Sequence, residues 1–228
     1  MSYLDQIASP TLLIDEKITK ANIQRMAEKA SRHGKKLVPH WKTAQSHEIG
    51  NWAKEYGITE VTASSIKLAE YLCGQGWENI HIAFPFNVRE ISRLNRLAEN
   101  QGISVQIVNT STIQALADQL TQSVGFFIEI DAGYGRTGVA ISDFQTINSI
   151  LSIAKTSSLL QFKGFYLHPG HTYYGVDKQK IHEESREALH ILKTTYQSSY
   201  PNLVTRLGDT PGCAVMEEFG DVDELGPG

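Results

Sequence analysis

The sequence predicts an α/β protein folded as a (β/α)₈, TIM-like barrel. Short apolar runs alternate with helical patterns along all 228 residues, which is typical of a parallel sheet with crossover helices. Seven such runs are visible and an eighth is available near the end, a count that favours a barrel over an open doubly wound sheet. A polar or glycine-rich segment follows most of these runs, and the carboxyl ends of barrel strands share the face where active sites lie.

The predicted strands are short and rich in apolar residues, and glycine, proline or polar residues bound them. They are Leu37–Val38, Thr59–Val61, Ile80–Ala83, Ser104–Val108, Phe126–Ile130, Phe162–Leu167 and Leu203–Leu207, with Val222–Leu225 as the eighth. No low-complexity tract, block of charge or linker interrupts the pattern, so we expect a single barrel domain.

Helical spacing of apolar residues fills the intervals between the strands. The predicted helices are Ile18–His33, Ser64–Gln75, Val88–Asn100, Thr110–Leu120, Ser142–Lys155 and Asp177–Tyr200. Short polar side chains can accept a hydrogen bond from the first turn of a helix, so Asn87, Thr110, Ser142 and Asp177 are the predicted caps.

Composition narrows the class of protein. A formal net charge of −4 gives no bulk attraction to nucleic acid or to an anionic membrane, and no apolar run approaches the length of a membrane span. The first residues lack the pattern of a signal peptide. Cys73 and Cys213 are the only cysteines, which fits a cytoplasmic protein with two reduced thiols; a disulfide between them is the alternative.

Lys42 is the first candidate for chemistry. It follows the first predicted strand in the run Pro39-His40-Trp41-Lys42, where a barrel would place an imine-forming lysine. Burial among apolar groups would lower the proton affinity of its amine and make it a nucleophile. The alternative interpretation is a solvated lysine after a strand.

The loop from Gly133 to Gly138 satisfies the pattern G-x-G-x-x-G, which would indicate a dinucleotide site. Residues 139–141 separate it from the next helix, however, and no acidic residue follows about twenty positions on to hold a ribose. A loop that presents Arg136 to an anionic or phenolate oxygen is the favoured interpretation, and a simple turn is the other.

Two further strand ends carry candidate groups. His168 could handle a proton or pack against a ring, whereas a metal at His168 and His171 is disfavoured because no cysteine or carboxylate lies nearby in the sequence. Thr210 and the amides around Gly208 and Gly228 could bind phosphate after the last two strands, unless these segments are only turns. His182 and His190 are expected on a helix surface.

In this order, the segments resemble the D-threonine aldolase and D-serine dehydratase family, which uses pyridoxal phosphate and whose barrel is similar to the N-terminal domain of alanine racemase. The resemblance rests on residues 9–15, 39–43, 129–139, 208–211 and 224–228. It implies that Lys42 forms the internal aldimine and serves with His168 in catalysis. It also implies that Arg136 contacts the phenolic oxygen, that His168 lies against the pyridine ring, and that Gly208, Thr210 and Gly228 hold the phosphate.

Two departures from the family pattern qualify these implications. Gly226 stands where the family usually has an arginine before the final Pro-Gly. Members of the family continue into a β-rich C-terminal domain that supplies a metal-binding His/Cys pair, so residues 1–228 are expected to be a pyridoxal-phosphate-binding barrel truncated at its C-terminal end. No metal ligand is assigned in this chain, and a divalent metal is expected only together with that further domain.

The resemblance implies a pyridoxal-phosphate-dependent lyase acting on D-3-hydroxy amino acids, either by aldolase-like cleavage of D-threonine or by dehydratase-like deamination of D-serine. An amino-acid racemase and a non-catalytic pyridoxal-phosphate-binding homeostasis protein are the alternatives, and a dinucleotide-dependent oxidoreductase ranks last. The implied partner is a small D-amino acid, and relatives form dimers, which implies a homodimer.

Overall fold

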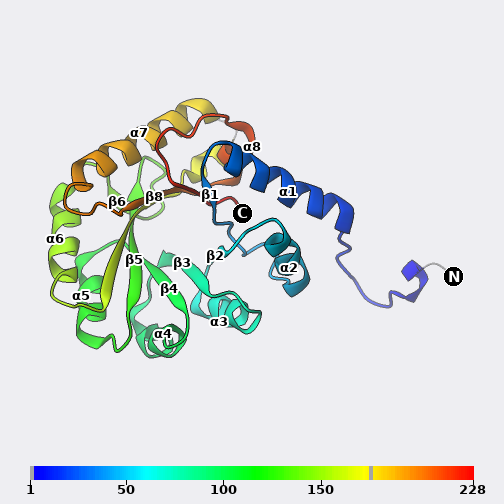
Figure 1. Ribbon diagram of the computed structural model, residues 1–228, viewed down its shortest axis with the longest axis horizontal. Helices are drawn as coiled ribbons and strands as arrows, with labels where there is room; N and C mark the ends of the chain where they lie inside the picture. The colour runs from blue at the N-terminus through cyan, green and yellow to red at the C-terminus, as the bar shows by residue number, and fades with distance from the viewer. Residues whose placement is uncertain (1–2, 175–176) are drawn as a thin grey trace.

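The computed structural model describes residues 3–174 and 177–228 and confirms the predicted barrel (Figure 1). Eight parallel strands follow one another in the order β1-β9-β8-β7-β5-β4-β3-β2, and a further short strand, β6, pairs with β5. The strands are β1 Lys36–Leu37, β2 Glu60–Ala63, β3 Asn79–Pro85, β4 Gly102–Ile107, β5 Val124–Asp131, β6 Val139–Ala140, β7 Leu160–Leu167, β8 Val204–Leu207 and β9 Glu224–Leu225.

The helices surround the strands and connect them. They are α1 Glu16–Arg32, α2 His47–Glu55, α3 Ile66–Gly74, α4 Ile91–Ala98, α5 Thr110–Gln119, α6 Phe144–Ala154, α7 Lys178–Tyr196 and α8 Thr210–Val215, with short 3₁₀ turns at Tyr3–Gln6, Val88–Glu90 and Gly170–Tyr174. The predictions missed α2 and α8. Asn87 and Asp177 are caps as predicted, but Asn109 and Asp143 cap α5 and α6 in place of Thr110 and Ser142.

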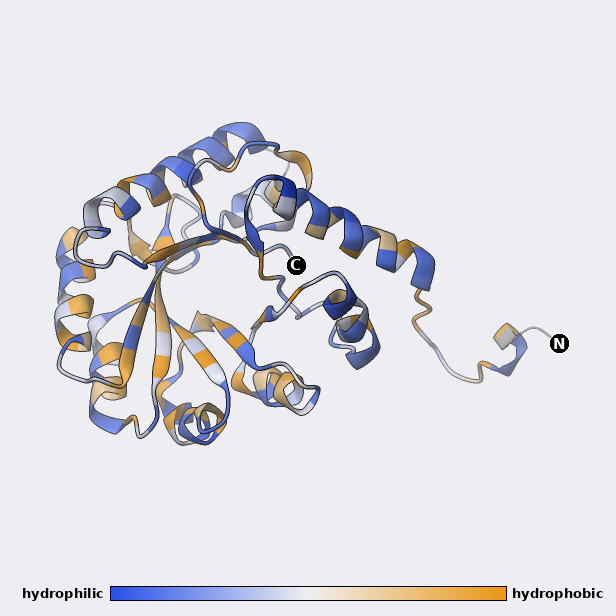
Figure 2. Cartoon of the chain, in the orientation of Figure 1, coloured by the Kyte–Doolittle hydropathy of each residue, from blue (hydrophilic) through white to orange (hydrophobic). Residues whose placement is uncertain are grey.

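An apolar layer between strands and helices holds the fold together. Figure 2 shows hydrophobic residues concentrated on the strands, while hydrophilic residues colour much of α1 and α7. Side chains such as Ile113 of α5, Ile147 of α6 and Leu192 of α7 are fully buried. Each such burial contributes about 1.5–3 kcal/mol relative to exposure, so packing rather than helix propensity stabilises these helices.

The barrel closes least regularly between β1 and β2. These strands share only an isolated bridge between His40 and Thr62, made by hydrogen bonds from Trp41 N to Thr62 O (2.8 Å) and from Thr62 N to Pro39 O (2.8 Å). The residue that follows this closing segment is Lys42. The sequence therefore positions Lys42 at the seam of the barrel.

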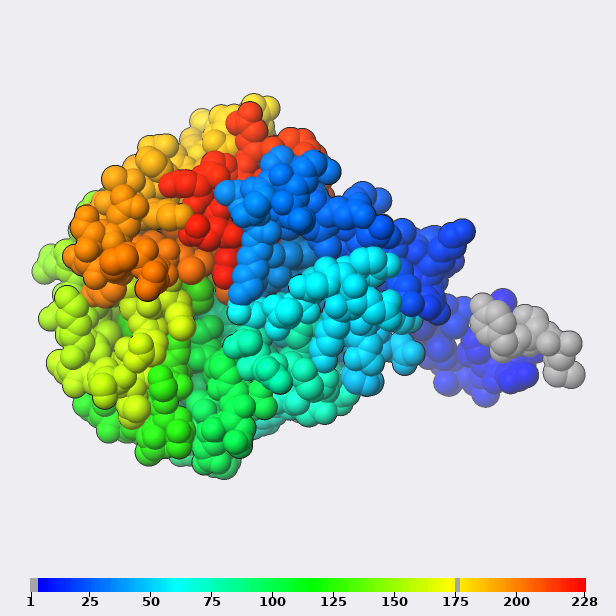
Figure 3. All heavy atoms as spheres, viewed as in Figure 1, coloured from blue at the N-terminus to red at the C-terminus, as the bar shows by residue number. Residues whose placement is uncertain are grey.

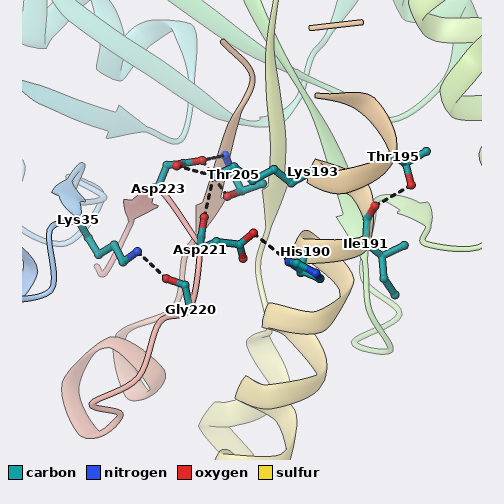
Figure 4. A network of polar contacts seen from close by, with 9 residues as sticks. All are labelled: Lys35, His190, Ile191, Lys193, Thr195, Thr205, Gly220, Asp221 and Asp223. Carbon is teal, nitrogen blue, oxygen red and sulfur yellow. Dashed lines mark hydrogen bonds and ion pairs between the residues drawn. The ribbon is translucent and has the colours of Figure 1, made fainter. Parts of the chain in front are cut away.

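Side chains fasten the short strand β9 to its surroundings (Figure 4). The carboxylate of Asp223 accepts hydrogen bonds from Thr205 N (2.8 Å) and Thr205 Oγ1 (3.0 Å) and lies 2.6 Å from Lys193 Nζ of α7. Just before it, Asp221 pairs with His190 at 2.9 Å. These contacts tie the approach to β9 against α7 and β8.

His190 lies on the surface of α7 as expected, with 54% of its side chain exposed. The same expectation is wrong for His182, which is buried and hydrogen-bonds the Glu218 carbonyl at 2.7 Å. His182 packs at 5.5 Å against the ring of Phe219, so it belongs to the contact between α7 and the segment before β9.

Residues 3–15, which precede α1, extend away from the barrel (Figures 1 and 3). Leu12, Leu13 and Ile14 in this segment are exposed. Among the described residues, none of the helices combines the length and the apolar character needed to cross a bilayer.

Candidate functional site

A cavity of about 170 Å³ opens at the carboxyl ends of the barrel strands. Its walls include five of the six predicted site residues, namely Lys42, Arg136, His168, Gly208 and Gly228, together with His40, Ser64, Ala83, Phe84, Tyr166, Tyr173, Asp209 and Gly226. The sixth, Thr210, hydrogen-bonds to Gly228 and Tyr173 at the edge of the cavity. The strand-end positions therefore converge in space.

Larger hollows exist elsewhere on the barrel. One of about 740 Å³ opens at the amino ends of the strands and contains none of the predicted residues, and one of about 690 Å³ runs beside α1 and borders Thr210 and Gly228. We assign the site to the smaller cavity because lysine, arginine, histidine and tyrosine side chains gather there with backbone donors.

Lys42 stands at the rim of this cavity. A Cβ added at Gly228 would lie 3.8 Å from Lys42 Cε, so the two residues are neighbours. The Gln45 side-chain amide donates to the Lys42 carbonyl at 2.7 Å and holds the loop. The expected burial of the amine among apolar groups is wrong, because Lys42 is exposed to solvent in this structure.

His40 lines the same cavity as Lys42 but is less exposed, and it was not identified as a site residue from the sequence. Burial lowers the pKa of its imidazole to about 3, and the positive charges of Lys42 and Arg136 push the pKa in the same direction. Its Nδ1 accepts a weak 3.4 Å hydrogen bond from Lys42 N. Because an acceptor Nδ1 leaves the proton on Nε2, His40 is a neutral ring with an N–H donor.

His168 is connected across the cavity to the next strand end. Its Nδ1 forms a short hydrogen bond with the Gly208 carbonyl, which assigns the proton to Nδ1 and leaves Nε2 as an acceptor. Burial lowers the pKa of His168 to about 4, although the bond to Gly208 acts in the opposite direction. His168 is therefore a neutral ring near pH 7.

Tyr166 forms part of the floor of the cavity and was also missed. Tyr166 lies on β7 and His168 follows directly after the end of this strand, and both residues line the cavity. A Cβ added at Gly208 would lie 2.6 Å from the Tyr166 hydroxyl, so only glycine fits there. Burial raises the pKa of Tyr166, which keeps the phenol protonated as a neutral donor.

Arg136 reaches the cavity from the glycine loop after β5. The Asp131 carboxylate accepts hydrogen bonds from Gly133 N (3.1 Å) and Gly135 N (3.0 Å), and Gly135 has a positive φ of 72° that favours glycine. The strand β6 follows this loop instead of a helix, which agrees with the interpretation that it presents Arg136 and does not bind a dinucleotide.

Thr210 is the centre of a compact group of donors. Its Oγ1 accepts hydrogen bonds from Gly228 N (2.8 Å) and Tyr173 Oη (3.1 Å), while Thr210 N donates to Tyr173 Oη at 3.2 Å. The neighbouring carboxylate of Asp209 accepts from Gly212 N (2.6 Å) and Thr172 Oγ1 (2.8 Å). The other oxygen of Asp209, Oδ1, is buried without a hydrogen-bond partner. Two amides and two hydroxyls at this edge of the cavity are therefore the donors available to an anion.

Across the described parts of the chain, no group of three or more His, Cys, Asp and Glu side chains could hold a metal ion. The side chains that line the cavity supply an amine, a guanidinium, two neutral imidazoles, several hydroxyls and the carboxyl group of Asp209. A pocket of this kind suits an anionic small molecule that also carries a group reactive toward an amine.

The barrel and this cavity define a (β/α)₈-barrel protein with a lysine at its first strand end. The sequence model of the alanine racemase N-terminal domain matches residues 14–228, so the chain belongs to that family.

Curated relatives include 3-hydroxy-D-aspartate aldolase of Paracoccus denitrificans, which is 27% identical over 72% of this chain and 44% of its own length. D-serine dehydratase of Dictyostelium discoideum is 24% identical over 99% of this chain and 62% of its own length. The chain thus spans about half of the length of the relatives that it matches. These names confirm the resemblance.

Solved structures show the same fold. D-threo-3-hydroxyaspartate dehydratase from a Delftia species superposes with a TM-score of 0.88 at 21% identity, covering 97% of this chain and 60% of that one. D-threonine aldolase from Filomicrobium marinum superposes with a TM-score of 0.87 at 20% identity, covering 99% of this chain and 62% of that one. At these identities the likeness establishes the architecture of the barrel.

Proposed function

We propose that residues 1–228 form the pyridoxal-phosphate-binding barrel of a lyase that acts on D-3-hydroxy amino acids. The observation that carries the proposal is the convergence of Lys42, Arg136 and His168 with the Thr210–Gly228 donors in one cavity. The relatives named as aldolases and dehydratases of D-hydroxy amino acids support a lyase over a racemase.

The residues present fit the cofactor in four separate ways. The Lys42 amine can bond covalently to its aldehyde, and the donors around Thr210 and Gly228, with the Gly208 turn, can take its phosphate. Arg136 can meet its phenolic oxygen and the neutral ring of His168 can lie against its pyridine ring. Bound pyridoxal phosphate would supply an electron sink for negative charge at the substrate α-carbon.

The chain's own groups then divide the proton handling. The Lys42 amine would be the base on one face of the substrate. His168 offers an unprotonated Nε2 because Gly208 occupies its Nδ1. Tyr166 offers a protonated hydroxyl on the cavity floor beside Gly208, and it would be available to the ring nitrogen because Gly226 has no side chain for that role.

Several finer assignments accompany this proposal. Aldol cleavage and dehydration both start from the same α-carbon chemistry, so we propose that the substrate is a small D-amino acid with a 3-hydroxyl group. A non-catalytic pyridoxal-phosphate-binding role is the second candidate, and the exposure of Lys42 favours it. We also propose a cytoplasmic homodimer; the two free thiols support the compartment.

An absorbance titration tests the cofactor assignment. The purified protein should develop a visible band on addition of pyridoxal phosphate, and Lys42→Ala should abolish it. Lys67→Ala is the matched control, because Lys67 is also exposed but lies outside the cavity. A wild-type protein without this band would overturn both the lyase and the binding-protein readings.

A product assay separates the two readings. The protein with pyridoxal phosphate is incubated with D-threonine or D-serine, with and without a divalent metal ion, and glycine and pyruvate are measured. Glycine from D-threonine indicates an aldolase, and pyruvate from D-serine indicates a dehydratase. Cofactor binding with neither product from the full-length protein would favour the non-catalytic protein.

A further inference from the structure

We propose that Glu129 is the positioning residue for Arg136, and that the Arg136 guanidinium closes onto its unpaired carboxylate oxygen when the cavity is occupied. The proposal rests on the proposed function only in that pyridoxal phosphate is taken as the occupant. Glu129 begins one of the segments that carry the family resemblance, but it was given no role there; it lies within the mostly apolar strand β5.

The burial of Glu129 is the first observation. Only 2% of its side chain is exposed, and its Oε2 atom has no hydrogen-bond partner. A buried carboxylate oxygen without a hydrogen-bond partner costs free energy, so its presence indicates that a donor to this oxygen is missing. Burial correspondingly raises the pKa of Glu129, whereas Gln106, Arg136 and Thr137 lower it.

The position of Arg136 is the second observation. Its Nη2 atom lies 3.9 Å from Glu129 Oε1, which is too long for a hydrogen bond, and 48% of its side chain is exposed. Its other contact is the ring of Tyr134, whose centroid is 5.5 Å from the guanidinium carbon. The planar fork of an arginine matches a carboxylate, so a small inward movement would form a bidentate pair.

No other carboxylate in the described parts of the chain forms an ion pair with Arg136. Asp131 belongs to the same loop, but its oxygens accept hydrogen bonds from the amides of Gly133 and Gly135. Asp131 therefore shapes the loop, while Glu129 is left to orient the guanidinium.

Further polar side chains lie in the barrel interior on strands near the one that carries Glu129. His81 Nε2 lies 3.3 Å from Gln106 Oε1, and His81 Nδ1 lies 3.0 Å from Ser104 Oγ. Ser104 and Gln106 come from β4, which pairs with the strand that carries Glu129, and His81 comes from β3 on the far side of β4. Barrel interiors usually contain branched apolar side chains, so a polar line that ends beneath Arg136 indicates a functional use.

The first experiment uses the protein without cofactor. Arginine Nε–H signals are recorded by NMR, and the Arg136 signal is assigned with Arg136→Lys. Glu129→Gln should move this signal, because it removes a carboxylate that lies 3.9 Å from Arg136 Nη2, and it should not affect the Arg93 signal. Glu70→Gln is the matched control. It should change the Arg93 signal and leave the Arg136 signal unchanged, because Glu70 lies 2.6 Å from Arg93. An unmoved Arg136 signal in Glu129→Gln would overturn the proposal.

The second experiment measures the affinity for pyridoxal phosphate in a double-mutant cycle. Glu129→Gln and Arg136→Gln should each weaken binding roughly ten- to a hundredfold, and the double variant should be no weaker than Arg136→Gln alone. Glu129→Asp, which keeps the charge but is one methylene shorter, should lie between wild type and Glu129→Gln. Losses that multiply in the double variant would contradict a role through Arg136.

Thermal unfolding distinguishes positioning from support of the fold. Glu129→Gln removes a buried charge with an unpaired oxygen, so its melting temperature without cofactor should be equal to or above that of wild type. A melting temperature that falls in step with affinity would instead mean a structural role. If wild type binds no pyridoxal phosphate, the proposed function fails, and the NMR comparison still decides the pairing of Glu129 with Arg136.

Discussion

Arg206 and Glu224 form an ion pair inside the barrel, with Arg206 Nε 2.6 Å and Nη2 2.5 Å from Glu224 Oε2. Lys36 Nζ lies 4.0 Å from the other oxygen of Glu224 and 2.5 Å from Glu60. The four residues stand on β8, β9, β1 and β2 and alternate in charge. Side chains thus link the four strands around the seam, where backbone pairing is least extensive.

Breaking the Arg206–Glu224 pair should destabilise the barrel strongly. Arg206→Met leaves a buried carboxylate without its partner, and such losses cost about 3–5 kcal/mol. The double variant Arg206→Met with Glu224→Leu should recover much of that loss, since it buries no charge. Urea denaturation of the three proteins gives the free energies of unfolding, and a cost within error of zero for the single variant would contradict the prediction.

Asp223 should act as an anchor for β9. Asp223→Ala removes two hydrogen bonds from Thr205 and the ion pair with Lys193, so the free energy of unfolding should fall by about 2–3 kcal/mol. Hydrogen exchange at the amides of residues 224–226 should accelerate as the strand loosens. Asp221→Ala is the control and should change both quantities much less, because its partner His190 is exposed.

Gly164 should tolerate no side chain. Its φ is 143°, and an added Cβ would lie within 1.8 Å of the Val204 carbonyl oxygen on the neighbouring strand β8. Gly164→Ala should therefore cost more than about 3 kcal/mol, because either β7 or β8 must move. Gly57 also has a positive φ (78°), but an added Cβ would meet no atom within 4 Å. Thermal unfolding of Gly57→Ala should therefore show a loss of stability of only about 1–2 kcal/mol.

The stability of the protein should fall in mild acid because of His40 and His168. Burial holds their pKa values at about 3 and about 4, below the value of 6.5 expected when unfolded, so the unfolded chain binds more protons. Their contribution is complete above pH 6.5 and is lost as the pH falls toward 4 and then 3, at about 1.4 kcal/mol per pH unit for each histidine.

Urea denaturation between pH 7 and pH 4.5 measures this slope. His40→Gln and His168→Gln should each flatten it, whereas His47→Gln, which replaces an exposed ring outside the cavity, should leave it unchanged. Equal slopes in wild type and in both cavity variants would show that neither ring resists protonation in the folded protein.

The barrel was predictable from the alternation of strands and helices, because each parallel strand needs a crossover. The two missed helices have local causes. Residues 208–212 contain glycine and proline and suggest a turn, yet Asp209 caps α8 and Pro211 suits its first turn. Helix α2 is only 9 residues long, and its start at the Ser46 cap passed unnoticed.

The site was predictable only where residues follow strand ends. Lys42, Arg136 and His168 lie in the segments that follow apolar runs, so the shared barrel face brings them together. Tyr166 and Glu129 lie within strands instead, and whether a strand residue faces the cavity depends on register and on the closure of the barrel. The exposure of Lys42 likewise depends on how the loop after the seam folds.

The isolated bridge between β1 and β2 has a consequence for molecular motion. Hydrogen bonds at Thr62 are all that joins the backbone of these two strands, and Lys42 follows immediately on one side of them. Any breathing of the barrel at this point would carry the amine away from Arg136 and His168. The same motion would then open the seam and weaken the hold of Lys42 on a bound ligand.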